Sequence, residues 1–100
     1  MENHSVSVEI EYCDGWGYES RYKELAAMIK QKLPEAQVSG TVGRMTSFEV
    51  KVNDTIIHSK LSTMSFPNYE EVCNIVYDTA TKGSQPTQVT KTESNWCSIL

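Results

Sequence analysis

The chain has 100 residues, of which 39% are hydrophobic, and this is enough for one domain with a modest core. The net charge is −4 with acidic and basic residues interspersed, so the basic stripe of a nucleic-acid-binding protein is not present and no nucleic-acid partner is expected. The start, Met-Glu-Asn-His, lacks the basic and apolar runs of a signal peptide, and no apolar run approaches the roughly 20 residues of a membrane span.

The first half of the chain predicts a strand, a helix and a second strand. Apolar and polar residues alternate over residues 6–12, which indicates a half-buried strand, and residues 13–15 interrupt this alternation. Helical spacing follows over about residues 17–32, and Pro34 fits the exit from the helix. Residues 36–42 are expected to form the second strand. The apolar face of the predicted helix comprises Tyr22, Leu25, Ala26, Ile29 and Leu33.

The second half predicts a hairpin and a second helix. Residues 48–52 and 55–59 read as strands joined by a tight turn at residues 53–54. Asn68 is suited to cap a helix, with Glu71 three residues later. The order β-α-β-β-β-α predicts an α/β fold, more narrowly an α+β sandwich with a mixed four-stranded sheet and two helices. The buried face of the second helix is expected to comprise Val72, Ile75, Val76, Thr79 and Ala80.

The chain changes character at Gly83, after which it is polar and without periodicity. We therefore expect a domain over residues 1–82 and a flexible tail over residues 83–100. The last four residues, Cys-Ser-Ile-Leu, fit the C-a-a-X prenylation pattern, and a final leucine favours a geranylgeranyl group. This predicts lipidation of Cys97 and a cytoplasmic protein held at the inner face of membranes. The alternative is that these four residues match by chance.

The three cysteines, Cys13, Cys73 and Cys97, are too widely spaced for a disulfide framework or a zinc site, and no metal is expected. Cys13 differs from the others because it falls where the first predicted strand gives way to the first predicted helix. Free N–H groups and the helix dipole favour a thiolate at such a position, whereas the neighbouring Asp14 disfavours it. Cys13 is therefore the candidate redox residue.

The sequence around this cysteine, Glu11-Tyr12-Cys13-Asp14-Gly15-Trp16-Gly17-Tyr18, resembles the selenoprotein W (Rdx) family, whose pattern is Tyr-Cys-x-x-Cys or selenocysteine. The resemblance implies a thioredoxin-like fold and a link to thiol redox chemistry. The Cys-aliphatic-Leu ending is similar to a prenylated branch of the family. Further similar segments are Tyr22-Lys23-Glu24-Leu25, Ser47-Phe48-Glu49-Val50, Ile57-His58-Ser59-Lys60 and Phe66-Pro67.

Position 16 departs from the family pattern, because it holds Trp16 where the second cysteine or selenocysteine should be. Cys13 then has no resolving thiol in its own loop. Either the natural protein is a one-cysteine variant, or tryptophan stands in for selenocysteine, whose codon UGA differs from UGG by one base. For Trp16 itself we expect packing, with its side chain partly covering the loop. Cys13 as a thiol without chemistry is the plain alternative.

Three other residues receive structural interpretations. Cys73 is expected to be buried and inert. His58 is expected to be exposed or at the edge of the core, although pairing with the Cys13 thiolate is an alternative. Tyr22 is expected to pack, because the paired tyrosine motif of the prenylated branch would need a second tyrosine where the chain has Leu33-Pro34.

The leading interpretation is a membrane-tethered, thioredoxin-like protein linked to thiol redox regulation and acting through protein partners. Its candidate catalytic positions are Cys13 and Trp16, the latter as the position of the family's second cysteine or selenocysteine, and Cys97 is the candidate lipidation site. The first alternative is a thiol oxidoreductase that uses Cys13 with glutathione as co-substrate, because a glutathione thiol can replace the missing resolving partner. The second is an interaction domain without catalysis. No bound cofactor is expected, and a monomer is expected.

Overall fold

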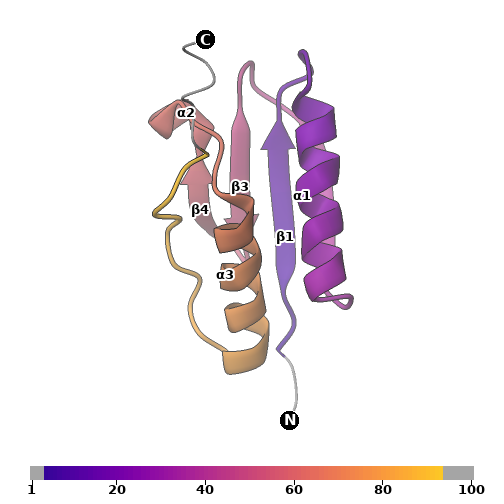
Figure 1. The fold of residues 1–100 in the computed structure, drawn as a ribbon, viewed down its shortest axis with the longest axis vertical. Helices are drawn as coiled ribbons and strands as arrows, with labels where there is room; N and C mark the ends of the chain where they lie inside the picture. Colours follow the sequence, from indigo (N-terminus) through magenta and orange to yellow (C-terminus); the bar gives the residue numbers. More distant parts are fainter. Residues whose placement is uncertain (1–3, 94–100) are drawn as a thin grey trace.

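A computed structural model describes residues 4–93 and contains every element that the sequence predicts, together with one more (Figure 1). Of the described residues, none belongs to a helix long and apolar enough to cross a membrane. The addition is the short helix α2. In chain order the elements are β1 (Ser7–Tyr12), α1 (Tyr18–Lys32), β2 (Gln37–Val42), β3 (Phe48–Val52), β4 (Thr55–Ser59), α2 (Lys60–Thr63) and α3 (Tyr69–Lys82).

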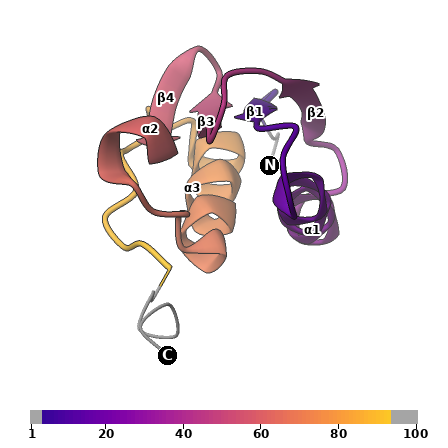
Figure 2. The same cartoon turned by 90° about the horizontal axis from the view of Figure 1, so that it is seen from above.

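The four strands form one mixed sheet in the order β2-β1-β3-β4. β1 and β2 are parallel and α1 makes the crossover between them, whereas β1–β3 and β3–β4 are antiparallel. Seen from above, α1 and α3 lie on the same face of the sheet (Figure 2). The predicted α/β fold with a mixed four-stranded sheet is therefore confirmed, with a third helix added.

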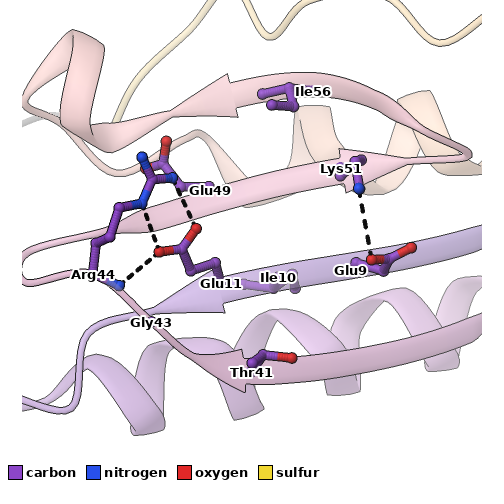
Figure 3. A pocket seen from close by; sticks show the side chains of 9 residues that line it. All are labelled: Glu9, Ile10, Glu11, Thr41, Gly43, Arg44, Glu49, Lys51 and Ile56. Carbon is purple, nitrogen blue, oxygen red and sulfur yellow. Dashed lines mark hydrogen bonds and ion pairs between the residues drawn. The ribbon is translucent and has the colours of Figure 1, made fainter.

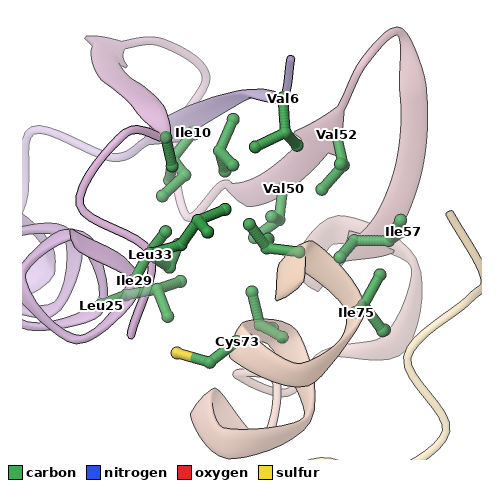
Figure 4. Packing of buried hydrophobic residues seen from close by; sticks show 14 of the residues in the cluster. Val6, Ile10, Leu25, Ile29, Leu33, Val50, Val52, Ile57, Cys73 and Ile75 are labelled. Carbon is green, nitrogen blue, oxygen red and sulfur yellow. The ribbon is translucent and has the colours of Figure 1, made fainter. Parts of the chain in front are cut away.

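The core lies between the sheet and the two long helices (Figure 4). Alternation in β1 and β3 directs every second side chain to the helices, which bury their predicted faces against them. Each fully buried aliphatic side chain contributes about 1.5–3 kcal/mol. The fully buried set includes Val8, Ile10, Leu25, Ile29, Val50, Val52, Val72 and Val76.

Tyr22 packs across β1 and β2, as expected. Its ring stacks on Tyr12 with the centroids 5.0 Å apart. A Cβ atom built on Gly40 would lie 2.5 Å from the Tyr22 ring, so the glycine leaves the space that the ring fills. The glycine that interrupts the apolar pattern of β2 thus serves the packing of α1.

The segment after α3 differs from the predicted flexible tail, because residues 88–93 run back along β4 and the start of α3. The backbone N–H of Val89 donates to the Ile57 carbonyl at 2.8 Å, and the Gln88 side chain donates to the Ile56 carbonyl at 2.7 Å. These bonds occupy part of the outer edge of β4, which would otherwise present unpaired backbone groups.

Glu71 holds residues 88–93 in place through several hydrogen bonds. Its carboxylate accepts the Thr90 N–H at 2.9 Å, the Thr90 hydroxyl at 2.7 Å and the Lys91 N–H at 2.8 Å. Asn68, whose side chain caps α3 as predicted, also donates its backbone N–H to the Lys91 carbonyl. Hydrophobic periodicity does not predict this docking, because the docking depends on hydrogen bonds to backbone groups of a polar segment.

The pKa of Glu71 predicts how this docking responds to acid. Burial raises it, but the hydrogen bonds from Thr90 and Lys91 outweigh burial and leave the pKa below the ordinary value of 4.5. A lowered pKa means that the docking energy is fully present above pH 4.5 and is lost as the pH falls through the folded-state value. The Thr90 and Lys91 amide shifts in NMR spectra should titrate in that acid range.

Glu71→Gln is the matched control, since it keeps an acceptor oxygen and removes the charge. It should abolish this titration, and Glu71→Ala should lower the free energy of unfolding by about 1 kcal/mol because the carboxylate is only partly buried. Unchanged Thr90 and Lys91 titration in Glu71→Gln would show that another group holds the segment.

Candidate functional site

Cys13 directly follows the last residue of β1, at the end of the sheet where residues 13–17 lead into α1 (Figure 1). Its backbone N–H donates to the Ser47 carbonyl at 3.0 Å, which continues the β1–β3 pairing by one more bond. The side chain is buried, with 8% of its surface exposed. The strand–helix junction predicted for Cys13 is thus observed. The cysteine begins the loop 13–17 and is bonded to the loop 43–47.

The loop after Cys13 ends in a tight turn over residues 15–18. The Tyr18 N–H donates to the Gly15 carbonyl at 3.4 Å, and Gly17 has φ 77° and ψ −6°. These angles are those of the third residue of a type II turn, where glycine is favoured. Trp16 occupies the second position, and its side chain is 99% exposed. The expectation that Trp16 covers the loop is wrong, because the turn directs the indole away from the protein.

The described donor to the sulfur comes from the loop and not from the helix. The Gly15 N–H lies 3.2 Å from the Cys13 Sγ atom, whereas α1 begins only at Tyr18. A Cβ atom on Gly15 would lie 3.3 Å from the sulfur, so glycine permits this close backbone approach. The sequence predicted that the N–H groups of a helix N-terminus would stabilise the Cys13 thiolate. In the structure, the described N–H group near the sulfur belongs to Gly15 in the loop.

Glu11 holds the second loop of the site. Its carboxylate accepts the Arg44 backbone N–H at 2.6 Å and the Arg44 guanidinium at 2.8 and 2.9 Å (Figure 3). The hydrogen bonds from Arg44 lower the pKa of Glu11 to about 2. Because Arg44 belongs to the loop that presents the Ser47 carbonyl to Cys13, this ion pair positions one wall of the site. Neither residue stands out in the sequence pattern.

A groove of about 310 Å³ lies beside this ion pair, on the sheet face turned away from the helices (Figure 3). It is lined by side chains of both charges, with Lys51 3.8 Å from Glu9. Across residues 4–93, no cluster of three or more histidine, cysteine, aspartate or glutamate side chains is placed to hold a metal ion.

Glu49 positions α2, the third element at this end of the sheet. Glu49 is 8% exposed, and its carboxylate accepts the backbone N–H groups of Lys60 at 2.9 Å and Leu61 at 3.2 Å. The Lys60 ammonium group then lies 5.3 Å from the Tyr18 ring centroid. Alternation placed Glu49 on a polar face and gave no sign that it would start a helix.

The other candidate residues lie away from this arrangement. Cys73 is buried on α3 as expected, and burial raises the pKa of its thiol. His58 is buried and not exposed; its Nε2 lies 2.7 Å from the Ser65 carbonyl oxygen, and burial lowers its pKa. None of the hydrogen bonds described within residues 4–93 joins Cys13 to His58, so the pairing alternative has no support. Cys97 lies outside the described residues.

Comparison with known proteins decides the family. The model of the Rdx family matches residues 7–78. The chain belongs to the Rdx family. Selenoprotein W of Danio rerio is 32% identical over 59 residues, which cover 56% of this chain and 69% of that protein.

Two further relatives of the chain carry the name migration and invasion enhancer 1. The Bos taurus protein is 35% identical over 68 residues and the Mus musculus protein is 35% identical over 66 residues. These matches cover 68% and 66% of this chain and 58% and 56% of the relatives, so the chain spans somewhat more than half the length of those proteins.

Solved structures agree with the Rdx fold. A selenoprotein W-related protein from Vibrio cholerae superposes with a TM-score of 0.65 at 19% identity, covering 75% of this chain and 96% of that one. A Bordetella parapertussis protein gives a TM-score of 0.54 at 20% identity, covering 75% and 98%. The predicted thioredoxin-like fold is confirmed, and family membership supports a redox-associated protein.

The left-handed conformation of Gly17 generates a prediction about the loop. Nothing lies within 4 Å of a Cβ atom built there, so Gly17→Ala introduces backbone strain without a clash. We expect a loss of about 1–2 kcal/mol in the free energy of unfolding, measured by urea titration. Gly17→Asn should cost less, because asparagine tolerates this region. Equal losses for the two variants would contradict the explanation by backbone conformation.

Proposed function

We propose that this Rdx protein takes part in thiol redox regulation through Cys13 while a prenyl group on Cys97 holds it at the inner face of membranes, where it acts on protein partners. The observation that carries the redox half is the placement of the Cys13 sulfur at the end of β1 with the Gly15 N–H directed at it. Family membership supports the same class of chemistry.

With Trp16 in the loop, the proposed reaction uses glutathione to resolve the intermediate. The Cys13 thiolate attacks a disulfide, forms a new S–S bond and releases one thiolate, so that two electrons pass to the released half. A glutathione thiolate then attacks the sulfur of the substrate half or of the bound glutathione. If the bound group is glutathione, this step releases glutathione disulfide; if it is the substrate, the substrate leaves as a mixed disulfide with glutathione. In both cases Cys13 returns as a thiolate. Glutathione is thereby the reductant and no resolving cysteine is required.

A second function is favoured by one observation, the burial of Cys13. Cys13 is only 8% exposed, whereas Trp16 in the same loop is 99% exposed. Under this alternative the domain binds partners through the surface around the loop and Cys13 does not turn over. Glutathionylation of Cys13 separates the two functions, because an interaction domain does not need it.

The redox proposal predicts the outcome of replacing Trp16. Trp16→Cys changes an exposed side chain, so the fold should be retained, and the introduced thiol recreates Cys-x-x-Cys in one loop. With Cys97 replaced by serine in both proteins to remove the third thiol, oxidation with glutathione disulfide should give an intramolecular disulfide in this variant, whereas the chain with Trp16 should gain only one glutathione, at Cys13. Intact mass and thiol counting distinguish the two products.

The matched control for that experiment is Cys13→Ser, which should remain unmodified at the loop. Because Cys73 is buried and its pKa is raised, it should not react while the protein is folded. A folded Trp16→Cys variant that is only glutathionylated would contradict the thioredoxin-like interpretation of the site. A Cys13 that stays unmodified in the parent chain would favour the interaction domain.

The membrane half of the proposal predicts the behaviour of Cys97. In cells, the protein should gain the mass of a geranylgeranyl group and sediment with membranes, and Cys97→Ser should remain in the soluble fraction. Cys73→Ser is the control and should sediment as the parent does. Equal membrane fractions for the parent and Cys97→Ser would remove the tether from the proposal.

A further inference from the structure

Three strongly exposed apolar side chains gather at the end of the molecule that carries Cys13. Trp16, Met45 and Met64 are 99%, 80% and 83% exposed. They come from the β1–α1 loop, the β2–β3 loop and the end of α2, and all three connections lie at the same end of the sheet (Figure 1). We call this set the apolar end. Scattered single apolar residues need no explanation, but three on neighbouring connections at one end of a small domain make that end a candidate contact surface.

The three connections are fastened to one another, so the apolar end is presented as a unit. The Cys13 N–H bonds to the Ser47 carbonyl, which joins the first loop to the second. The Lys60 ammonium group bonds to the Thr46 carbonyl at 3.4 Å, which joins α2 to the second loop. The same ammonium group lies 5.3 Å from the Tyr18 ring at the start of α1.

The chain returns to this end after α3. Glu93 pairs with Arg21 on the first turn of α1 at 2.6 Å and donates its backbone N–H to the Phe66 carbonyl at 2.8 Å. The proposed lipid site, Cys97, follows four residues later, which is at most about 14 Å of extended chain. A tail free from Gly83 onward would allow the domain to turn in any direction, whereas fastening at Glu93 does not.

We propose that the apolar end is a membrane-contacting surface that lies against the lipid bilayer when the chain is tethered at Cys97. This inference rests on the proposed lipid tether. A single lipid chain binds membranes only marginally and requires a second signal, and the chain supplies no polybasic segment near Cys97. Tryptophan is the side chain most suited to the membrane interface, and Trp16 is the most exposed member of the set.

Charges around the apolar end do not supply the attraction. Arg44 is paired with Glu11 and Arg21 with Glu93, and the charge of Lys60 at this end is offset by that of Asp14, which adjoins Trp16. Contact should therefore depend on apolar insertion and be nearly the same for neutral and anionic lipids, with little dependence on salt.

In the test, a tag at one end or the other of the full chain attaches the protein to vesicles. The measurement therefore does not require prenylation of Cys97. The Trp96→Phe background leaves Trp16 as the single tryptophan. A hexahistidine tag after Leu100 binds the protein to phosphatidylcholine vesicles containing a nickel-chelating lipid. Trp16 fluorescence is compared between vesicles with and without brominated acyl chains. We expect a blue shift and quenching by the brominated lipid.

The matched control carries the tag before Met1. The backbone N–H of His4 bonds to the Ala80 carbonyl at the end of α3, at the opposite end of the sheet (Figure 1). This tether turns the apolar end away from the vesicle, so Trp16 should not be quenched. Absence of quenching with the C-terminal tag, or equal quenching with both tags, would overturn the proposal. Failure of prenylation is scored separately, by the mass of the cellular protein.

Variants of the apolar end give a second measurement. In the geranylgeranylated protein, Trp16→Ala should weaken partition into neutral vesicles about tenfold, and Met64→Asp at least as much. Ile56→Asp is the control, because Ile56 is exposed on the sheet face beside the groove and should leave partition unchanged. Self-association in sedimentation that Trp16→Ala abolishes would assign the surface to a second copy of the chain and overturn the membrane assignment.

Discussion

The antiparallel pairing of β1 with β3 is the interaction on which the site depends. β1 lies inside the sheet, paired with β2 on one side and β3 on the other, so its alternation determines which side chains enter the core. Tyr12 opposite Phe48 is the last pair of this ladder, and the bond from Cys13 to Ser47 extends it into the loops. The cysteine is therefore placed by the sheet, and the loop after it only determines what surrounds the sulfur.

Three glutamates hold the surrounding segments by one common device, a carboxylate that accepts backbone N–H groups from another part of the chain. Glu11 holds the β2–β3 loop, Glu49 holds the start of α2, and Glu71 holds the segment after α3. Charge-assisted bonds of this kind are stronger than neutral ones. The acidic residues of this chain thus do more than give it a negative net charge, because they fasten polar segments that have few apolar side chains of their own.

Sequence patterns predicted the strands and long helices, in which the apolar pattern repeats several times, and missed the features that depend on single contacts. Alternation in residues 6–12 and 48–52 and the helical spacing around Leu25 and Val72 were sufficient for the strands and long helices. The helix α2 was missed because four residues show no period and its start depends on Glu49. His58 was misplaced because the β3–β4 pairing shifts between Val50 and Lys51, and strict alternation does not reveal such an irregularity.

The site was predicted in part for the same reason. Cys13 at a strand end followed from the break in alternation, but the donor to its sulfur and the direction of Trp16 both depend on the turn made by Gly17. Turn type depends on backbone angles that composition only suggests. The docking of residues 88–93 was not predictable from composition either, since polar segments with and without a docking partner look alike.

The turn that carries Trp16 keeps this side chain outside the packing of the domain. The indole makes almost no contact with the domain, so the core, the sheet and the fastening glutamates are indifferent to which side chain stands there. A substitution at position 16 should therefore change what the loop presents to its surroundings at little cost in stability. The scaffold keeps the Cys13 side chain in a protected place and leaves position 16 free to vary without disturbing the packing.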